Sequence, residues 1–150
     1  MDTYNSTKDT LEHIRTVNRV MSKMVMEILS RMQNHDVTKL RSPEKETFDI
    51  YTPKLKGSTY GSDEYKVFLD EMKIALDNHY ALNSHHPEHY TDGIDGMDLI
   101  DLIEMLCDWK AATERHADGN IDKSIIINKD RFGMSEQLVK IFQNTVKRLF

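Results

Sequence analysis

The chain has 150 residues, of which 39% are hydrophobic and 30% are charged, as is typical of one globular domain rather than a disordered chain. Its formal net charge of −5 argues against a general nucleic-acid or membrane-surface binder, because such proteins carry a basic stripe. No apolar run is long enough to span a bilayer, and the N-terminus lacks the features of a signal peptide. The single cysteine, Cys107, has no disulfide partner within the chain, which suits a reducing cytoplasm. Together with the chain length, this predicts one cytoplasmic domain covering residues 1–150.

The first half of the chain has the pattern of three amphipathic helices. Apolar residues recur every three or four positions over residues 8–33, which predicts one long helix. The stretch SPEKETFDIY predicts a second helix, with Ser42 as its N-cap and Pro43 as its first residue. The following PKLKGSTYGS is typical of a loop. Ser62 is placed to cap a third helix that ends at Leu82.

The second half predicts two further helices and a connection. The stretch MDLIDLIEMLCDWKAATER is apolar over much of a helical circumference, which predicts a central helix. HADGNIDKSIIINKDRFG is interpreted as a connection; its isoleucine run resembles a strand, but a single strand has nothing to pair with. Ser135 is placed to cap a last helix, EQLVKIFQNTVKRLF. The predicted fold class is therefore all-α, with five or six helices.

Three positions before the histidine-rich stretch carry histidines that are candidate functional residues, and each also has a simpler structural interpretation. His13 lies among apolar residues of the first predicted helix, where a core or boundary histidine is the simpler interpretation. The pair His35-Asp36 ends that helix, and a favourable charge at a helix C-terminus followed by a turn residue is the simpler alternative. His79 lies near the end of the third predicted helix, where it also fits a solvated position.

The stretch ALNSHHPEHY, residues 81–90, contains three of the seven histidines. His85 and His86 are adjacent, and metal ligation, phosphate contact, a pH switch and a histidine-rich surface turn all fit that pattern. Pro87 stiffens this loop, because its φ angle is fixed and it restricts the preceding residue. For Glu88 and His89 we favour a place on the surface turn.

The predicted central helix carries three acids on one face, because Asp101, Glu104 and Asp108 are spaced i, i+3 and i+7. Asp101 and Glu104 also fit a solvated stripe. Asp108 lies among apolar residues, and a buried carboxylate needs a partner. Its neighbour Cys107 is expected to be a small buried hydrophobe. Imidazoles and carboxylates together are the ligand set of zinc, iron, manganese and related divalent metals.

The order of these residues, H…HD…H…HH…D, resembles the HD superfamily of metal-dependent phosphohydrolases. The motif HDVTK is similar to the HD-x-x-K form, in which the lysine, here Lys39, approaches a substrate phosphate. The stretch from HHPEHY to CDWKAA is similar in layout to the HD-GYP segment, with TDGIDG in place of GYP and shorter intervals between the histidines. Most of the chain also looks like a small HD-like family of bacteria and their phages.

The resemblance implies an HD-like helical bundle that holds one or two divalent ions: manganese, iron, cobalt, zinc or magnesium. The ligands that it implies for the first ion are His13, His35, Asp36 and Asp108. The residues that it implies for a second ion, or for direct phosphate contact, are His79, His85 and His86, with Asp36 shared between the ions. Lys39 is expected to neutralise a phosphate oxygen, and Glu104 to orient a ligand or a water molecule.

The function that the resemblance implies is hydrolysis of a nucleotide or a similar small phosphate ester by metal-activated water. A nucleoside monophosphate is the first candidate substrate. One alternative is a phosphodiesterase that degrades a cyclic nucleotide or oligonucleotide signal, as a phage protein acting against a defence system would. Another is a non-catalytic helical protein that binds a metal or a nucleotide. The expected partner is a small phosphorylated molecule, not a nucleic-acid duplex or a membrane; a homo-oligomer is left open.

Overall fold

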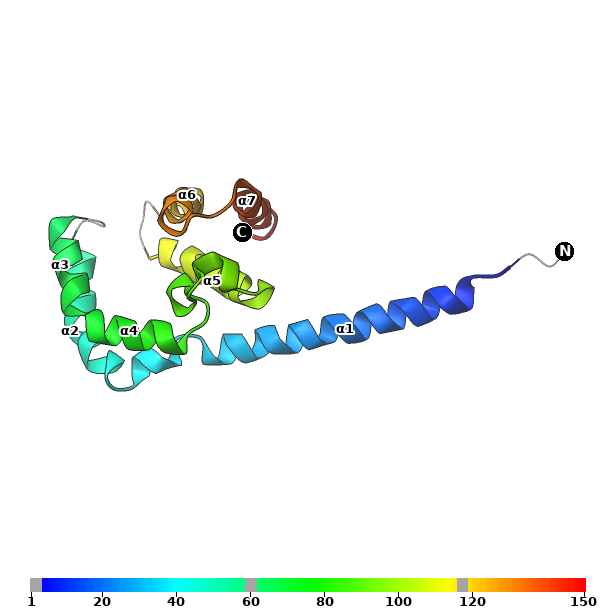
Figure 1. Cartoon of the computed structure of the whole chain (residues 1–150), viewed down its shortest axis with the longest axis horizontal. Coiled ribbons are helices and arrows are strands. Elements are labelled where there is room, and N and C mark those ends of the chain that lie inside the picture. Colours follow the sequence, from blue (N-terminus) through cyan, green and yellow to red (C-terminus); the bar gives the residue numbers. More distant parts are fainter. Residues whose placement is uncertain (1–3, 59–61, 116–118) are drawn as a thin grey trace. The chain divides into compact units, whose positions relative to one another are not determined.

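The structure is a computed structural model, which describes residues 4–58, 62–115 and 119–150 (Figure 1). Over these residues all regular structure is helical, with seven α-helices and three short 3-10 helices, so the all-α prediction is confirmed and the predicted number of helices was too low. The chain divides into two compact units, Met1–Asn34 and His35–Phe150, called here the N-terminal and C-terminal units. The organisation as a single domain stays a prediction. Among the described residues, no helix is long and apolar enough to cross a membrane.

The described part of the N-terminal unit consists mainly of one long helix, α1 (Thr7–Asn34). The Asn5 side chain accepts a hydrogen bond from the backbone N–H of Thr7 at 3.0 Å, which satisfies one of the free donors at the helix start. The long amphipathic helix expected from the apolar repeat is confirmed, although none of its 28 residues is buried.

The first half of the C-terminal unit contains four helices: η1 (Val37–Leu40), α2 (Glu44–Gly57), α3 (Asp63–Glu71) and α4 (Lys73–Leu82). Helix α2 packs against η1, α3 and α4. The predicted cap at Ser62 is confirmed, because its side chain accepts a hydrogen bond from the backbone N–H of Tyr65. The predicted third helix is instead two helices, divided at Met72, which is 1% exposed. Because this stretch contains neither glycine nor proline, its local sequence carries no signal for the division.

Both predicted ends of the second helix were wrong. Helix α2 begins at Glu44, with Pro43 rather than Ser42 as its N-cap. At the other end it continues through Pro53 to Gly57, where a loop was expected. A contact with α3 stabilises this extension, because the Lys54 ammonium lies 5.5 Å from the centre of the Phe68 ring. Tertiary packing here outweighs the helix-breaking tendency of proline.

The second half of the C-terminal unit contains η2 (Pro87–His89), η3 (Gly93–Gly96), α5 (Leu99–Thr113), α6 (Ile121–Phe132) and α7 (Glu136–Leu149). Its apolar core is built between α5, α6 and α7, in agreement with the predicted central helix. The buried members of this core are Met105, Leu106, Ile125, Met134, Val139, Phe142 and Val146. The Trp109 ring stacks on Phe132 and meets Phe142 edge-on.

The isoleucine run lies in helix α6, so the prediction of a connection was wrong over Ile121–Phe132, and the run is not a strand either. Of the three isoleucines in the run, Ile125 faces the core at 0% exposure, whereas Ile126 and Ile127 are exposed. Asn120 caps the start of this helix, and Gly133 ends it in a left-handed conformation with φ 64°. The predicted cap at Ser135 on α7 is confirmed.

The loop between α4 and α5 folds tightly around one glycine. A Cβ atom on Gly96 would lie 2.8 Å from the Cβ of Tyr90, which is closer than real side chains allow. We therefore expect Gly96→Ala to lower the free energy of unfolding by about 1–3 kcal/mol, because the Tyr90 backbone has to move. Gly57→Ala is the matched control, since nothing lies within 4 Å of its added Cβ. Urea denaturation of both variants measures the difference, and equal stabilities would contradict this account of the loop.

Candidate metal centre

Asp36, the acid of the HD dipeptide, has an unusual backbone conformation. With φ 57° and ψ 13° it lies in the left-handed region, and among the described residues it is the one non-glycine residue with positive φ. Aspartate tolerates this region better than most residues, but the conformation still costs free energy. Residues held in this way are concentrated at functional sites, where the surrounding structure maintains them.

Three histidine rings surround the Asp36 carboxylate. His79 extends from α4 and His85 from the loop after it, and each is 2% exposed. Their Nε2 atoms lie 3.3 Å and 3.5 Å from Asp36 Oδ1, respectively. The half-buried His86 completes the group, because its Nε2 lies 2.9 Å from Nε2 of His79. The solvated alternative for His79 is therefore wrong.

In both His79 and His85, a carboxylate holds the other ring nitrogen. Glu44 Oε2 lies 2.9 Å from Nδ1 of His79. Glu104 Oε1 lies 3.2 Å from Nδ1 of His85. Because a carboxylate oxygen accepts hydrogen bonds, each Nδ1 donates its proton and each Nε2 keeps a lone pair. Histidines that bind metals in proteins are held in the same way.

The Nε2 lone pairs and the Asp36 carboxylate have the spacing of metal ligands. Ligand atoms about 2.0–2.1 Å from a tetrahedral ion lie about 3.3 Å from one another, close to the 3.3 Å and 3.5 Å found here. Within the described part of the chain, Asp36 Oδ1 and His85 Nε2 are buried without a hydrogen-bond partner. Leaving two such acceptors facing each other is costly, and a cation between them satisfies both. The residues present therefore fit a divalent metal.

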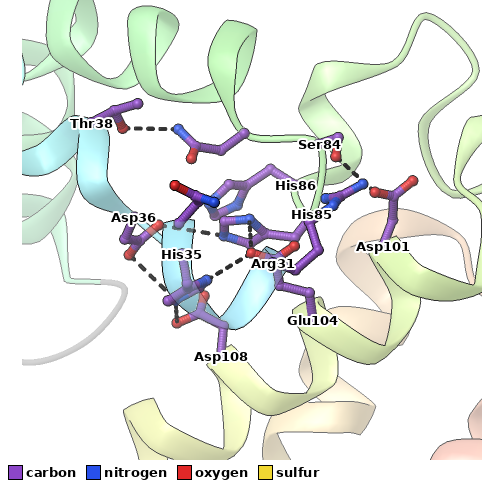
Figure 2. A network of polar contacts seen from close by, with 12 residues as sticks. Arg31, His35, Asp36, Thr38, Ser84, His85, His86, Asp101, Glu104 and Asp108 are labelled. Carbon is purple, nitrogen blue, oxygen red and sulfur yellow. Dashed lines mark hydrogen bonds and ion pairs between the residues drawn. The ribbon is translucent and has the colours of Figure 1, made fainter. Parts of the chain in front are cut away.

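A second group of possible ligands shares Asp36 with the first. His35 Nε2 lies 3.6 Å from Asp36 Oδ2 and 3.8 Å from Asp108 Oδ1. Glu104 accepts from Nδ1 of His35 at 2.9 Å, and Figure 2 shows Glu104 and Asp108 extending from α5 toward this ring. The fold thus brings together six of the seven predicted ligands: His35, Asp36, His79, His85, His86 and Asp108.

The remaining predicted residues have different places. His13 is exposed on α1 in the N-terminal unit and belongs to none of the possible ligand groups among the described residues, so its role stays a prediction. His89 Nδ1 lies 2.8 Å from the backbone carbonyl of Tyr80, as fits a surface turn. Cys107 is exposed, so the expectation of a buried thiol was wrong.

Lys39, the predicted phosphate contact, lies beside the cluster. Its ammonium group is 2.6 Å from Asp36 Oδ2 and 5.2 Å from the centre of the Phe48 ring. Its side chain is one third exposed, so it lies at the boundary between the buried histidines and solvent.

Glu44 is the main residue of this site that the sequence did not reveal. It is 0% exposed, and its carboxylate accepts hydrogen bonds from Thr38 Oγ1 at 2.9 Å and Asn78 Nδ2 at 2.8 Å, besides the contact with His79. Asn83 Nδ2 donates in turn to Thr38 Oγ1 at 2.9 Å. An acid in the first turn of a helix is ordinarily a favourable surface charge, so local sequence contains no signal for this burial.

Asp101 is also buried, at 1% exposure, so the solvated alternative for this acid is wrong. It accepts a hydrogen bond from Ser84 Oγ at 2.7 Å (Figure 2). It accepts a second one from Tyr90 Oη at 2.6 Å. It also forms a capping box with Asp98 at the start of α5. These contacts attach the loop that carries His85 to the helix that carries Glu104 and Asp108.

The electrostatics of the cluster favour an added positive charge. Hydrogen bonds to Asp108 and Glu104 raise the pKa of His35 to about 10. Burial would raise the pKa of Asp36, but the Lys39 ammonium, through its charge and its hydrogen bond, helps to hold it well below its usual range. Burial, together with neighbouring imidazoles, lowers the pKa of His86 to about 3, so this ring is neutral and able to ligate.

Comparison with known proteins places the chain in one family. The model of the family of unknown function DUF5662 matches residues 2–148. The chain belongs to this family. The match covers nearly the whole sequence, so the family includes both α1 and the C-terminal unit. Neither the search of curated proteins nor the search of solved structures found a match.

Removal of the central carboxylate tests the metal centre directly. We expect the wild-type protein to bind about one or two equivalents of manganese or zinc, and Asp36→Asn to lose most of that binding, because an amide cannot balance the ion's charge. Asp49→Asn is the control, since this exposed acid on α2 pairs with Lys45. Metal analysis after dialysis measures the content of each protein. Equal metal content in wild type and Asp36→Asn would contradict the assignment.

A separate variant tests the contact between Glu44 and His79. Glu44→Gln is expected to weaken metal binding about 10- to 100-fold, because the amide holds the Nδ1 proton less firmly. Glu46→Gln is the matched control, because it removes an exposed acid from the same helix turn. Isothermal titration with zinc at constant pH compares the affinities, and circular dichroism verifies that each variant is folded. An affinity equal to that of the wild type in a folded Glu44→Gln would rule out this positioning role.

Proposed function

We propose that this protein is an HD-type metal-dependent phosphohydrolase that acts on a nucleotide or a similar small phosphate ester. The observation that carries the proposal is the convergence of imidazole Nε2 atoms on Asp36, with each opposing Nδ1 held by a carboxylate. This arrangement agrees with the order of motifs that resembles the HD superfamily. An arrangement of this kind serves metal ligation better than core stability, because unpaired buried acceptors destabilise a fold.

The residues that would hold a first ion are Asp36, His79, His85 and His86. Those that would hold a second are His35, Asp36 and Asp108. When bound, a divalent ion polarises phosphate oxygens and lowers the pKa of a coordinated water. The number of available ligands exceeds the four of a closed structural zinc site, which favours a centre with room for substrate.

The exposure of the side chains indicates how substrate would approach. Glu44, His79 and His85 form a buried wall, at 0–2% exposure. On the other side, His35 and Lys39 are each 33% exposed and Asp108 is 24% exposed. A phosphate group that enters from this edge meets the Lys39 ammonium, which can exchange its contact with Asp36 for a phosphate oxygen and stabilise charge in the transition state.

Glu44 and Glu104 would act through the histidines. By accepting the Nδ1 protons they keep the rings of His79, His35 and His85 oriented with Nε2 toward the centre. Asp101 fixes the position of His85, because its hydrogen bonds with Ser84 and Tyr90 hold the loop that carries His85 against α5. These contacts fix the ligands before substrate binds, so binding costs little reorganisation.

The net charge of −5 suits a small substrate better than a long polyanion, since positive charge is concentrated at the metal centre. A nucleoside monophosphate is our first choice. A cytoplasmic nucleotide as substrate also agrees with the single unpaired cysteine.

A phosphate-release screen tests the proposal. The protein is loaded with manganese, cobalt, iron, zinc or magnesium and offered nucleoside monophosphates, cyclic nucleotides and short oligonucleotides. We expect turnover of at least one nucleotide, with Lys39→Gln lowering kcat/KM about 10²-fold while metal content is unchanged. Lys45→Gln is the control, because this exposed lysine lies on α2 and pairs with Asp49. A metal-loaded protein that hydrolyses no phosphoester would overturn the enzymatic proposal and favour metal or nucleotide binding without catalysis.

A further inference from the structure

Helix α1 has an apolar face that is exposed along almost its whole length. None of its 28 residues is buried. Ten of its large apolar side chains are between 38% and 70% exposed. Soluble monomers rarely expose a continuous apolar surface of this size, and such surfaces mark sites of association. A helix of this kind gains most of its stability from packing of its apolar face.

The apolar residues of α1 follow the seven-residue repeat of a coiled coil. In such a repeat the positions are lettered a to g, and the residues at a and d face the partner helix. The a positions of α1 are Leu11, Asn18, Val25 and Met32. The positions that take the letter d are Ile14, Met21 and Ile28. The positions opposite this seam, f, are Asp9, Thr16, Lys23 and Ser30, all of them polar. Three heptads with a polar back face and an a/d seam that is apolar except at Asn18 are typical of helices that pair with each other.

We infer that α1 is a dimerisation helix, which pairs in parallel with α1 of a second copy of this chain. Asn18 is the polar residue in the seam. In a parallel pair an a residue faces the same residue of the partner, so the two Asn18 amides can hydrogen-bond to each other. In an antiparallel pair each Asn18 would face an apolar side chain and leave its amide unsatisfied, which is costly.

The available surface is sufficient for a stable dimer. Nine apolar side chains lie at a and d or beside them, because Val17, Met24 and Leu29 widen the seam. If each loses about 60–120 Å² of accessible surface, as a buried aliphatic side chain does, one helix buries about 800 Å². This area equals the contribution of each partner to a standard stable interface. The inference is independent of the proposed phosphohydrolase activity, since no seam residue belongs to the metal centre.

Sedimentation of the 150-residue chain tests the pairing. We expect the wild type to sediment at twice the 17.5 kDa mass of the chain at micromolar concentration. Ile14→Glu/Met21→Glu, which places charges in two seam layers, is expected to sediment as a monomer. Thr16→Glu/Ser30→Glu adds the same charge on the back face and is expected to stay dimeric. The thermal transition of each variant shows whether the C-terminal unit is still folded.

Cross-linking tests the parallel orientation. In a Cys107→Ser background, Asn18→Cys is expected to oxidise to a covalent dimer, because the two a residues face each other. Thr16→Cys, on the back face, is the control and is expected to stay largely uncross-linked. A monomeric wild type, a seam variant that stays dimeric, or cross-linking at Thr16→Cys as efficient as at Asn18→Cys would each overturn the inference. In that event the apolar face of α1 is covered by something other than α1 of a second copy.

Discussion

The described structure of the site depends on the contact between the Asp36 carboxylate and the imidazoles of His79 and His85. A left-handed backbone at Asp36 directs this carboxylate into the C-terminal unit, and both rings are almost completely buried where they meet it. Buried acceptors that face each other without a proton are destabilising. The fold tolerates them because a larger network of hydrogen bonds holds each member in place.

That network connects segments far apart in the sequence. Glu44 of α2 joins His79 of α4, and Glu104 of α5 joins both His35 and His85. A buried charge contributes little net stability unless its remaining hydrogen-bonding capacity is satisfied. Glu44 meets this condition through Thr38 and Asn78. The apolar core between α5, α6 and α7 lies apart from these acids and supplies the rigid base from which α5 extends Glu104 and Asp108.

The two units have different physical characters. The C-terminal unit has a packed apolar core and a buried polar network, which together suit a chemical site. The described N-terminal unit is a helix without buried residues, whose sequence repeats every seven positions, and this suits association. The match to the family DUF5662 extends over both units.

The sequence by itself determined the all-α class, the long first helix, the caps at Ser62 and Ser135, and six ligand residues of the candidate metal centre, Asp36 among them. The helices follow from the helical repeat of apolar residues. The caps follow from serine side chains that accept a hydrogen bond from the backbone N–H three residues later, and the ligands follow from the chemistry of imidazole and carboxylate. Tertiary structure alone decided the burial of Glu44 and Asp101, the division at Met72, and the helical state of the isoleucine run. It also decided which ring nitrogen of each histidine faces the centre, because a distant carboxylate holds the other nitrogen. Glu44 and His79 are 35 positions apart in the sequence, and His35 and Glu104 are 69 positions apart. Local propensity acts over a few residues, and only packing of distant segments can bury an acid beside a histidine.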